Sequence, residues 1–159
     1  MLKKDKNIRV FHAGMNYVYD YQKFKNDYPD QFIDAGIAEE IAIIEAAAAA
    51  NAGKTVYFTV ASSFFQRCYD QIVHDLIRNN SNVKLIVIRG MVTDIGDSHH
   101  GIYDLNMYNS FENVKIFMPI TVGDMENSLK EAAEYKGPVV IRLDGDLDTV
   151  EAMTSKETK

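Results

Sequence analysis

Two adjacent glutamates, Glu39 and Glu40, are the first residues along the chain whose type and position could do chemistry. They follow the segment Asp34–Ala38 and begin a helical pattern just after an apolar run that is typical of a strand. Acidic residues in the first turn of a helix complement the helix dipole, a stabilising role of about 0.3–1 kcal/mol each. A carboxyl group at a strand's carboxyl end can instead be partly desolvated, with a raised pKa, and can hydrogen-bond a ligand nitrogen. The pattern alone leaves both interpretations open.

A second candidate segment, Ser62–Arg67, opens the next helical pattern with paired aromatic residues beside an arginine. This combination suits a planar anionic ligand, and it suits ordinary core packing as well. Five polar residues then recur at the spacing of one helix face: Arg67, Asp70, Gln71, His74 and Asp75. A solvated, salt-bridged surface is the preferred interpretation of this face, and a polar interface is the alternative.

The loop Thr93–Gly101 is the segment richest in reactive side chains. It carries two carboxylates, two imidazoles and two glycines after a strand pattern, and such loops on a rigid scaffold are often functional. Imidazole and carboxylate groups are good metal ligands. However, the adjacent His99 and His100 would point in opposite directions in an extended segment, and no third spaced ligand is visible. We therefore expect no metal site, and prefer a histidine that transfers a proton or contacts phosphate.

Several well-known phosphate-binding and hydrolase motifs are absent. The chain contains no G-x-G-x-x-G, no G-x-x-x-x-G-K-[ST] and no G-x-S-x-G. Dinucleotide binding, P-loop chemistry and nucleophile-elbow hydrolysis therefore lose support. Gly53-Lys54-Thr55 looks like the end of a phosphate loop, but it precedes a strand pattern. It is interpreted as a helix C-cap and turn.

The elements that must position these residues alternate between short apolar runs and longer helical patterns. The predicted strands are Ile8–His12, Phe32–Ala35, Val56–Val60, Lys84–Ile88, Val114–Phe117 and Val139–Leu143. The predicted helices are Tyr17–Asp27, Glu39–Ala52, Phe65–Asn79 and Val122–Tyr135, the last with a capping-box start from Thr121 to Asp124. Strands that are apolar on both faces predict a three-layer α/β/α fold with a mostly parallel sheet of about six strands. Sites in such sheets form at the carboxyl ends of the strands.

Length and composition limit the classes of protein to consider. The 159 residues, of which 47% are hydrophobic, suit one globular domain over residues 1–148 with a polar tail at 149–159. The net charge of −6 argues against nucleic-acid binding. The single Cys68 excludes an intramolecular disulfide and fits a reducing cytoplasm. No apolar run is long enough for a signal peptide or a membrane span, so a cytoplasmic protein without membrane contact is expected.

Four segments, in order along the chain, carry a resemblance: Tyr28–Glu39, Phe64–Asp75, Ser98–Leu105 and Gly137-Pro138 before the last strand. They resemble the pyrimidine-binding domain of the transketolase family of thiamine-diphosphate enzymes, most closely that of 1-deoxy-D-xylulose-5-phosphate synthases. The resemblance extends over nearly the whole chain. It implies the three-layer fold of that domain and a part in a transferase of two-carbon units that serves isoprenoid precursor biosynthesis.

The resemblance also implies roles for individual residues. Glu39 matches the glutamate that hydrogen-bonds N1′ of the cofactor's aminopyrimidine, where a shared proton favours the tautomer that activates the thiazolium carbon. Phe64 matches the aromatic residue that stacks on the pyrimidine ring, and Ala38 lies beside the cofactor. Arg67 and His99 match residues on the substrate side, so the implied catalytic pair is Glu39 with His99.

Some positions depart from the family's pattern. Ala61 replaces an aromatic residue, His100 replaces a glutamine, and Ile95 replaces an aspartate that the adjacent Asp94 could restore by a shift of one residue. The segment Leu143–Asp146 replaces a Y-P-R-G ending, so acids stand where an arginine is expected to hold substrate phosphate. Cofactor activation is expected to be retained, while the identity of the sugar-phosphate substrate is put in doubt.

The resemblance further implies partners. The family binds the diphosphate and its magnesium on a separate domain, so this chain should hold only the pyrimidine half of thiamine diphosphate and should not be active alone. A homodimer is expected, with exposed apolar surface around Phe64, Phe65 and Tyr69 driving self-association. A split transketolase subunit and a degenerate, non-catalytic domain used for assembly or sensing are the alternatives.

Overall fold

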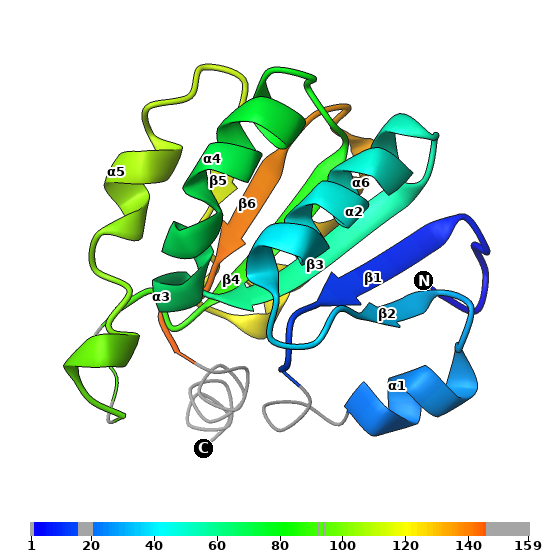
Figure 1. The fold of residues 1–159 in the computed structure, drawn as a ribbon, viewed down its shortest axis with the longest axis horizontal. Coiled ribbons are helices and arrows are strands. Elements are labelled where there is room, and N and C mark those ends of the chain that lie inside the picture. Colours follow the sequence, from blue (N-terminus) through cyan, green and yellow to red (C-terminus); the bar gives the residue numbers. More distant parts are fainter. Residues whose placement is uncertain (1, 16–20, 92, 94, 146–159) are drawn as a thin grey trace.

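Six parallel strands form the centre of the molecule. The computed structural model describes residues 2–15, 21–91, 93 and 95–145. The strands are β1 (Ile8–His12), β2 (Phe32–Asp34), β3 (Thr55–Ala61), β4 (Val83–Ile88), β5 (Lys115–Phe117) and β6 (Val139–Arg142). Their order across the sheet is β2-β1-β3-β4-β6-β5, and every pair is parallel (Figure 1). The predicted parallel sheet is therefore confirmed.

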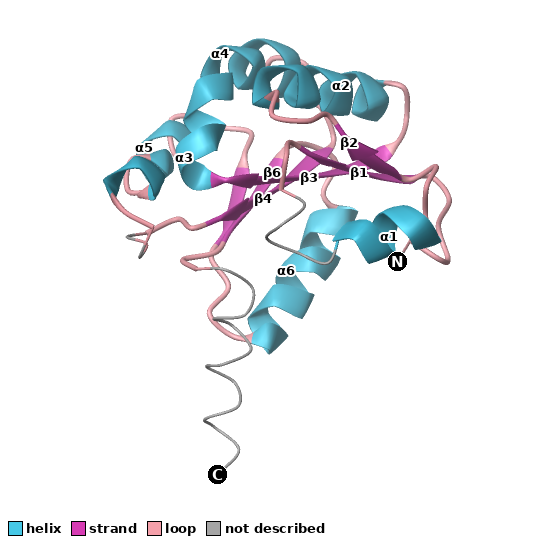
Figure 2. Ribbon diagram, turned by 60° about the horizontal axis from the view of Figure 1, so that its bottom comes forward, coloured by secondary structure: helices cyan, strands magenta, loops and turns pink. Residues whose placement is uncertain are grey.

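Helices cover both faces of this sheet. The longer ones are α1 (Tyr21–Asp27), α2 (Glu39–Asn51) and α6 (Val122–Glu134), and the shorter are α3 (Ser62–Phe65), α4 (Tyr69–Gln71) and α5 (Asp104–Tyr108). Figure 2 shows α2, α3 and α4 on one face and α1 and α6 on the other. The three-layer prediction is confirmed, because parallel strands with two apolar faces need helices on both.

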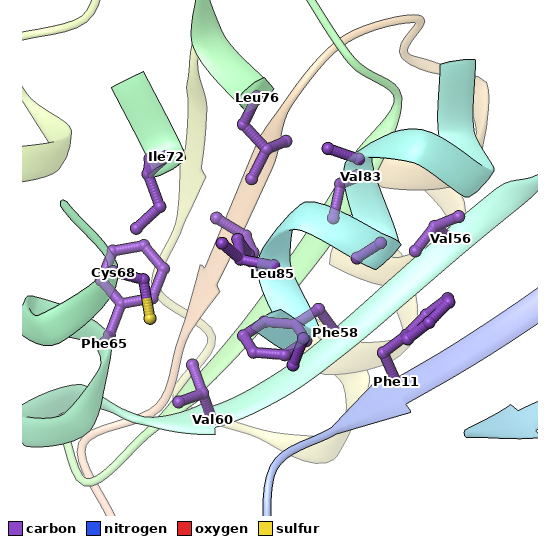
Figure 3. Close-up of a cluster of buried hydrophobic side chains, with 14 of the residues drawn as sticks. Phe11, Val56, Phe58, Val60, Phe65, Cys68, Ile72, Leu76, Val83 and Leu85 are labelled. Atoms are coloured by element: carbon purple, nitrogen blue, oxygen red, sulfur yellow. The ribbon is translucent and has the colours of Figure 1, made fainter. Parts of the chain in front are cut away.

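The core fills the space between the sheet and the helices of the α2 face. Phe58 and Leu85 from the central strands meet Phe65 and Leu76 from the helical side (Figure 3), and all four are fully or almost fully buried. The alanine run at the end of α2 lies against the same core, with Ala46, Ala47 and Ala50 buried. Small side chains there allow the helix backbone to approach the strands closely.

The helix ends follow the predicted local chemistry. Thr121 Oγ1 accepts a hydrogen bond from Asp124 N at 3.1 Å, and Asp124 Oδ2 accepts one from Thr121 N at 3.0 Å. This reciprocal pair is the predicted capping box at the start of α6. Gly53 has a φ of +86°, so it provides the left-handed turn that ends α2.

One predicted helix is wrong in its winding. The segment predicted as a single helix over Phe65–Asn79 is divided into α3, a 3₁₀ turn η1 (Gln66–Cys68), α4 and a π-helical stretch η2 (Ile72–Ile77). Phe65, Cys68, Ile72 and Leu76 all remain buried. Since 3₁₀, α and π turns place residues three to five apart on nearly the same face, apolar spacing predicts the buried face but not the winding.

Other boundaries differ less. The strand predicted to end at Ala35 ends at Asp34, and the predicted helix over Tyr17–Asp27 is described from Tyr21 onward. The short helix α5 and the 3₁₀ turn η3 (Asp97–His99) were not predicted. The predicted tail at 149–159, together with Asp94 and Asp146, lies outside the described residues. Within the described part of the chain, no helix has the length and apolar character that crossing a membrane requires.

Candidate functional site

The predicted site residues gather at the carboxyl edge of the sheet. Glu39 is the first residue of α2, which follows β2, and Phe64 and Arg67 lie just after β3. His99 ends the 3₁₀ turn η3 in the connection that follows β4. In Figure 1 the β3 arrow points toward the end where α3 begins. The topology therefore places the three segments together, as expected for a parallel sheet.

Glu39 is buried, with only 2% of the residue exposed. Its Oε2 lies 3.4 Å from Arg67 Nη1 but accepts no hydrogen bond from any described residue. Glu40 is partly exposed, and its Oε1 lies 3.4 Å from Arg67 Nε. The structure thus separates the two glutamates: Glu40 suits the helix-dipole interpretation, and Glu39 has the burial of a carboxyl group that receives a ligand.

Arg67 is half exposed and lies over both carboxylates. Distances of 3.4 Å are ion-pair contacts that lack the close geometry of a bidentate pair. The guanidinium can therefore move from one carboxylate to the other, or toward a ligand, at small cost. Among the other residues predicted to share its face, His74 and Asp70 form an exposed pair at 3.6 Å, which confirms a solvated surface at that point.

Phe64 and His99 are in direct contact. Their ring centroids are 5.2 Å apart at an interplanar angle of 74°, an edge-to-face arrangement. Phe64 is half-buried and packs against two core clusters, while His99 Nδ1 lies 2.9 Å from Ser98 Oγ. The second aromatic residue of the predicted pair, Phe65, lies in the core with 1% exposure and is not part of the site.

The two imidazoles of the histidine-rich loop have separate contacts among the described residues. His100 Nε2 lies 3.2 Å from the backbone oxygen of Thr93, and its Nδ1 lies 3.6 Å from Asp97 Oδ1. His99 instead contacts Phe64, so the two imidazoles have different neighbours. No group of three potential metal ligands occurs among the described residues. Ile95, which replaces a family aspartate, is exposed.

A buried ion pair lies beneath this edge, and sequence reasoning missed it. Arg142 Nε lies 3.2 and 3.0 Å from the two carboxylate oxygens of Asp104, and both residues are almost completely buried. Ser62 Oγ donates to Asp104 Oδ2 at 2.8 Å, and Arg142 Nη1 also pairs with Asp144. The one available signal was a charged residue at the end of the wholly apolar run Val139–Ile141.

His12 is the second polar residue that the sequence reasoning passed over. It ends β1, opposite Asp34 of β2, and is fully buried. Its Nδ1 accepts a hydrogen bond from Met15 N at 3.3 Å, and its ring contacts those of Tyr21 and Phe32 at centroid distances of 4.7 and 4.9 Å. Burial lowers the pKa of His12, against an opposing effect from Asp34 at 3.7 Å.

Comparison with known proteins agrees with this geometry. The family model described as "Transketolase, pyrimidine binding domain" matches residues 1–147. A 1-deoxy-D-xylulose-5-phosphate synthase of Clostridium perfringens is 36% identical over 151 residues, which are 93% of this chain and 24% of that protein. One from Desulfotalea psychrophila is 39% identical over 141 residues, 88% of this chain and 22% of that protein. The chain thus spans about a quarter of the length of these relatives.

Solved structures of transketolases are also similar to this chain. A chain described as "Split gene transketolase, inactive beta4 tetramer" superposes with a TM-score of 0.77 at 27% identity, over 90% of this chain and 46% of that one. Transketolase from Campylobacter jejuni superposes with a TM-score of 0.71 at 16% identity, over 89% of this chain and 23% of that one, which shows the shared fold alone. With the family model matching almost end to end, the chain belongs to the family of transketolase pyrimidine-binding domains.

Proposed function

We propose that this chain provides the pyrimidine half of a thiamine-diphosphate site in a transketolase-like transferase of two-carbon units. The observation that carries the proposal is the state of Glu39, a buried residue at the start of α2 whose Oε2 accepts no hydrogen bond from any described residue. A buried carboxylate oxygen that accepts no hydrogen bond is costly unless a ligand supplies the donor. Family membership and similarity to 1-deoxy-D-xylulose-5-phosphate synthases identify the class of ligand.

The residues present suit the aminopyrimidine of thiamine diphosphate. Glu39 would hydrogen-bond a ring nitrogen through Oε2, the half-buried ring of Phe64 would stack on the heterocycle, and Ala38 would lie beside it, next to Glu39. When bound, the cofactor supplies the nucleophilic thiazolium carbon on which two-carbon units are carried. Glu39, in its buried position, would hold the proton that is shared with the pyrimidine.

His99 and Arg67 would act on the substrate side. The Nδ1 atom of His99 is occupied by Ser98 Oγ at 2.9 Å, so Nε2 is the nitrogen left to exchange a proton with a substrate hydroxyl. Arg67 is half exposed and would hold the anionic group of a sugar-phosphate substrate. The carboxylate of Asp144, one of the acids that put this substrate in doubt, is paired with Arg142, so its charge is locally compensated.

The rest of the enzyme would come from partners. The chain spans about a quarter of its relatives, which supports a separate diphosphate-binding domain or subunit that carries the magnesium ion. The similar split-gene transketolase is consistent with a natural subunit of this kind. The buried, reduced Cys68, whose pKa is raised to about 12 mainly by burial, suits a reducing cytoplasm.

Self-association would use the outer face of α2. Ile41 and Ile44 of α2 are 55% and 44% exposed at helical spacing, and Ile37, just before the helix, is 83% exposed. Because α2 is buried on its other side, exposed isoleucines on the outer side of the same helix indicate a second contact surface. We propose that two copies meet here, in place of the predicted surface that included the buried Phe65. The similar split-gene protein is described as a tetramer.

The self-association proposal is tested by I41E/I44E in sedimentation velocity. The variant is expected to sediment as a monomer at concentrations where the wild type is a dimer. F24E, which places the same charge on the exposed Phe24 of α1, is the matched control and is expected to remain dimeric. A wild-type chain that is strictly monomeric would contradict the proposal.

The cofactor proposal is tested by hydrogen–deuterium exchange at C2 of thiamine diphosphate, followed by NMR. The chain is combined with a diphosphate-binding partner subunit, magnesium and the cofactor. The wild type is expected to accelerate exchange, and Glu39→Gln is expected to reduce it to the rate of the cofactor alone. Glu45→Gln, on the exposed side of the same helix, is the matched control. Wild-type exchange in Glu39→Gln would refute the role of Glu39, and absence of cofactor binding by calorimetry would favour a degenerate domain.

A further inference from the structure

We propose that Asp104 is a positioning residue for the candidate site: its buried carboxylate fixes the two chain segments that carry Phe64 and His99, and so holds the two rings in contact. This inference rests on the proposed function for its catalytic consequence, but its structural content can be measured without cofactor. Asp104 lies at the start of α5 with 0% exposure. Such a buried carboxylate requires several partners, and it has them on two different elements, the strand β6 and the helix α3.

The first partner, Arg142, makes the carboxylate immobile. Its Nε lies 3.2 and 3.0 Å from the two oxygens of Asp104, and the arginine is 1% exposed at the end of β6. Gly90 lies against the guanidinium so closely that a Cβ atom there would be 2.5 Å from Arg142 Cζ. Asp144 pairs with Nη1 of the same group. The guanidinium is thus enclosed, which anchors Asp104 to the sheet.

The second partner, Ser62, joins the carboxylate to the segment that carries Phe64. Its hydroxyl donates to Asp104 Oδ2 at 2.8 Å, and Ser62 itself is fully buried. Ser62 is the first residue of α3, directly after β3, and Phe64 follows two residues later. A charge-assisted hydrogen bond of this length fixes the angle at which α3 leaves the strand.

The same serine meets the segment that carries His99. Ser62 Oγ lies 3.4 Å from the backbone oxygen of Gly101, and a Cβ atom on Gly101 would fall 2.5 Å from Ser62 Cβ and 2.3 Å from Arg89 O. Gly101 N also donates to Met91 O at 3.1 Å, which closes the loop. The loop therefore passes against Ser62 without space to shift, and His99 lies two residues before this contact.

Phe64 and His99 thus extend from two segments whose fixed ends meet at Ser62 and Asp104. Their centroid separation of 5.2 Å depends on both segments keeping their directions. Replacing a buried ion pair by apolar residues is often neutral or even stabilising, so stability alone does not account for this pair. Its directional hydrogen bonds join α3, the loop and β6, and we attribute the pair to this role, which is to fix the relative positions of the three segments.

The test removes the Ser62 hydroxyl and measures the geometry of the two rings. In Ser62→Ala, the nuclear Overhauser effects between the Phe64 and His99 ring protons are expected to fall by more than half, and the His99 ring signals to move toward their unperturbed shifts. Ser128→Ala, a change at a buried serine of α6 away from this edge, is the matched control and should leave both unchanged. Ser62→Cys keeps a weaker donor and is expected to give an intermediate effect.

These outcomes distinguish a positioning role of Asp104 from a purely stabilising one, and they test that role independently of the cofactor proposal. A Ser62→Ala variant that is less stable but keeps the full contact between the two rings would overturn the positioning role, and so would a Ser62→Cys variant identical to the wild type. If the contact weakens as expected and cofactor exchange falls about 10-fold with it, both proposals stand. If the contact weakens in a chain that shows no cofactor exchange at all, the positioning role stands and the proposed function fails.

Discussion

Two arginine–carboxylate contacts lie at the same edge of the sheet and differ in almost every physical respect. Arg67 is half exposed and lies 3.4 Å from one oxygen of each of two glutamates, Glu39 and Glu40. Arg142 is enclosed and lies 3.0 and 3.2 Å from both oxygens of the buried Asp104. In the first contact the distances are long and the guanidinium is open to solvent, although Glu39 is buried; in the second the distances are short and both partners are buried.

This difference indicates which contact can exchange partners. An exposed ion pair contributes roughly 0–1 kcal/mol, so the half-exposed Arg67 can leave the partly exposed Glu40 with little loss, and it can leave the buried Glu39 when a ligand takes its place there. A buried pair cannot be broken without leaving an uncompensated charge in the core. We infer that the molecule places its exchangeable charges where a ligand arrives and its fixed charges one layer below, where they hold the ligand-facing segments.

The largest effect is expected from removing one partner of the buried pair. Arg142→Met should reduce the free energy of unfolding by about 3–5 kcal/mol, because Asp104 is left charged and buried without its cation. Urea denaturation followed by circular dichroism measures the loss. A reduction below about 1 kcal/mol would show that the Arg142 contact is as easily broken as the Arg67 contact.

A smaller loss is expected when both partners are removed together. The double variant D104L/R142M replaces the charges by apolar side chains of similar length, and it should recover most of the stability that Arg142→Met loses, to within about 2 kcal/mol of the wild type. Asp104→Leu alone completes the double-mutant cycle. Losses that simply add would show that burial of an unpaired charge is not the cause.

The contrast also explains which parts of the molecule could be predicted from the sequence. Runs such as Ile8–His12 and Lys84–Ile88 predicted parallel strands because they are apolar on both faces, and the positions of Glu39 and Phe64 followed from where strands end. The ligand-facing half of the site could be predicted because each of its residues lies in a short motif of neighbouring residues. The burial that distinguishes Glu39 from Glu40 came only from the structure.

The supporting layer could not be predicted in this way. Asp104 and Arg142 are 38 residues apart, and Ser62 is 42 residues from Asp104, so no local spacing connects them. The helical winding of the segment from Phe65 to Ile77 could not be predicted from the sequence for a related reason. It is set by packing against the sheet and α2, whereas the apolar spacing is compatible with several helical geometries.

His12 provides an intermediate case, since it is as buried as Arg142 but lacks a compensating charge of the same strength. Its pKa is lowered from 6.5 in the folded state, so the unfolded chain binds more protons just below that pH. Stability should therefore fall as pH drops below about 6.5, with a slope from this residue of at most about 1.4 kcal/mol per pH unit, the limit for one proton. Stability measured by urea denaturation from pH 7.5 to 5.5 should show this slope, and His12→Gln should remove it. Equal slopes in both proteins would contradict the assignment.

The smallest effect is expected at the exposed contact. Arg67→Gln should change the free energy of unfolding by less than about 1 kcal/mol, because the guanidinium is half exposed and meets its carboxylates without close geometry. Since salt screens exposed charges over about 10 Å at 0.1 M, the difference from the wild type should shrink further in 0.5 M sodium chloride. Urea denaturation at both salt concentrations measures this, with Arg78→Gln, a change to an arginine without a described ion pair, as the control. A salt-insensitive loss as large as that of Arg142→Met would mean that Arg67 is a fixed structural charge, and the division between exchangeable and fixed contacts would fail.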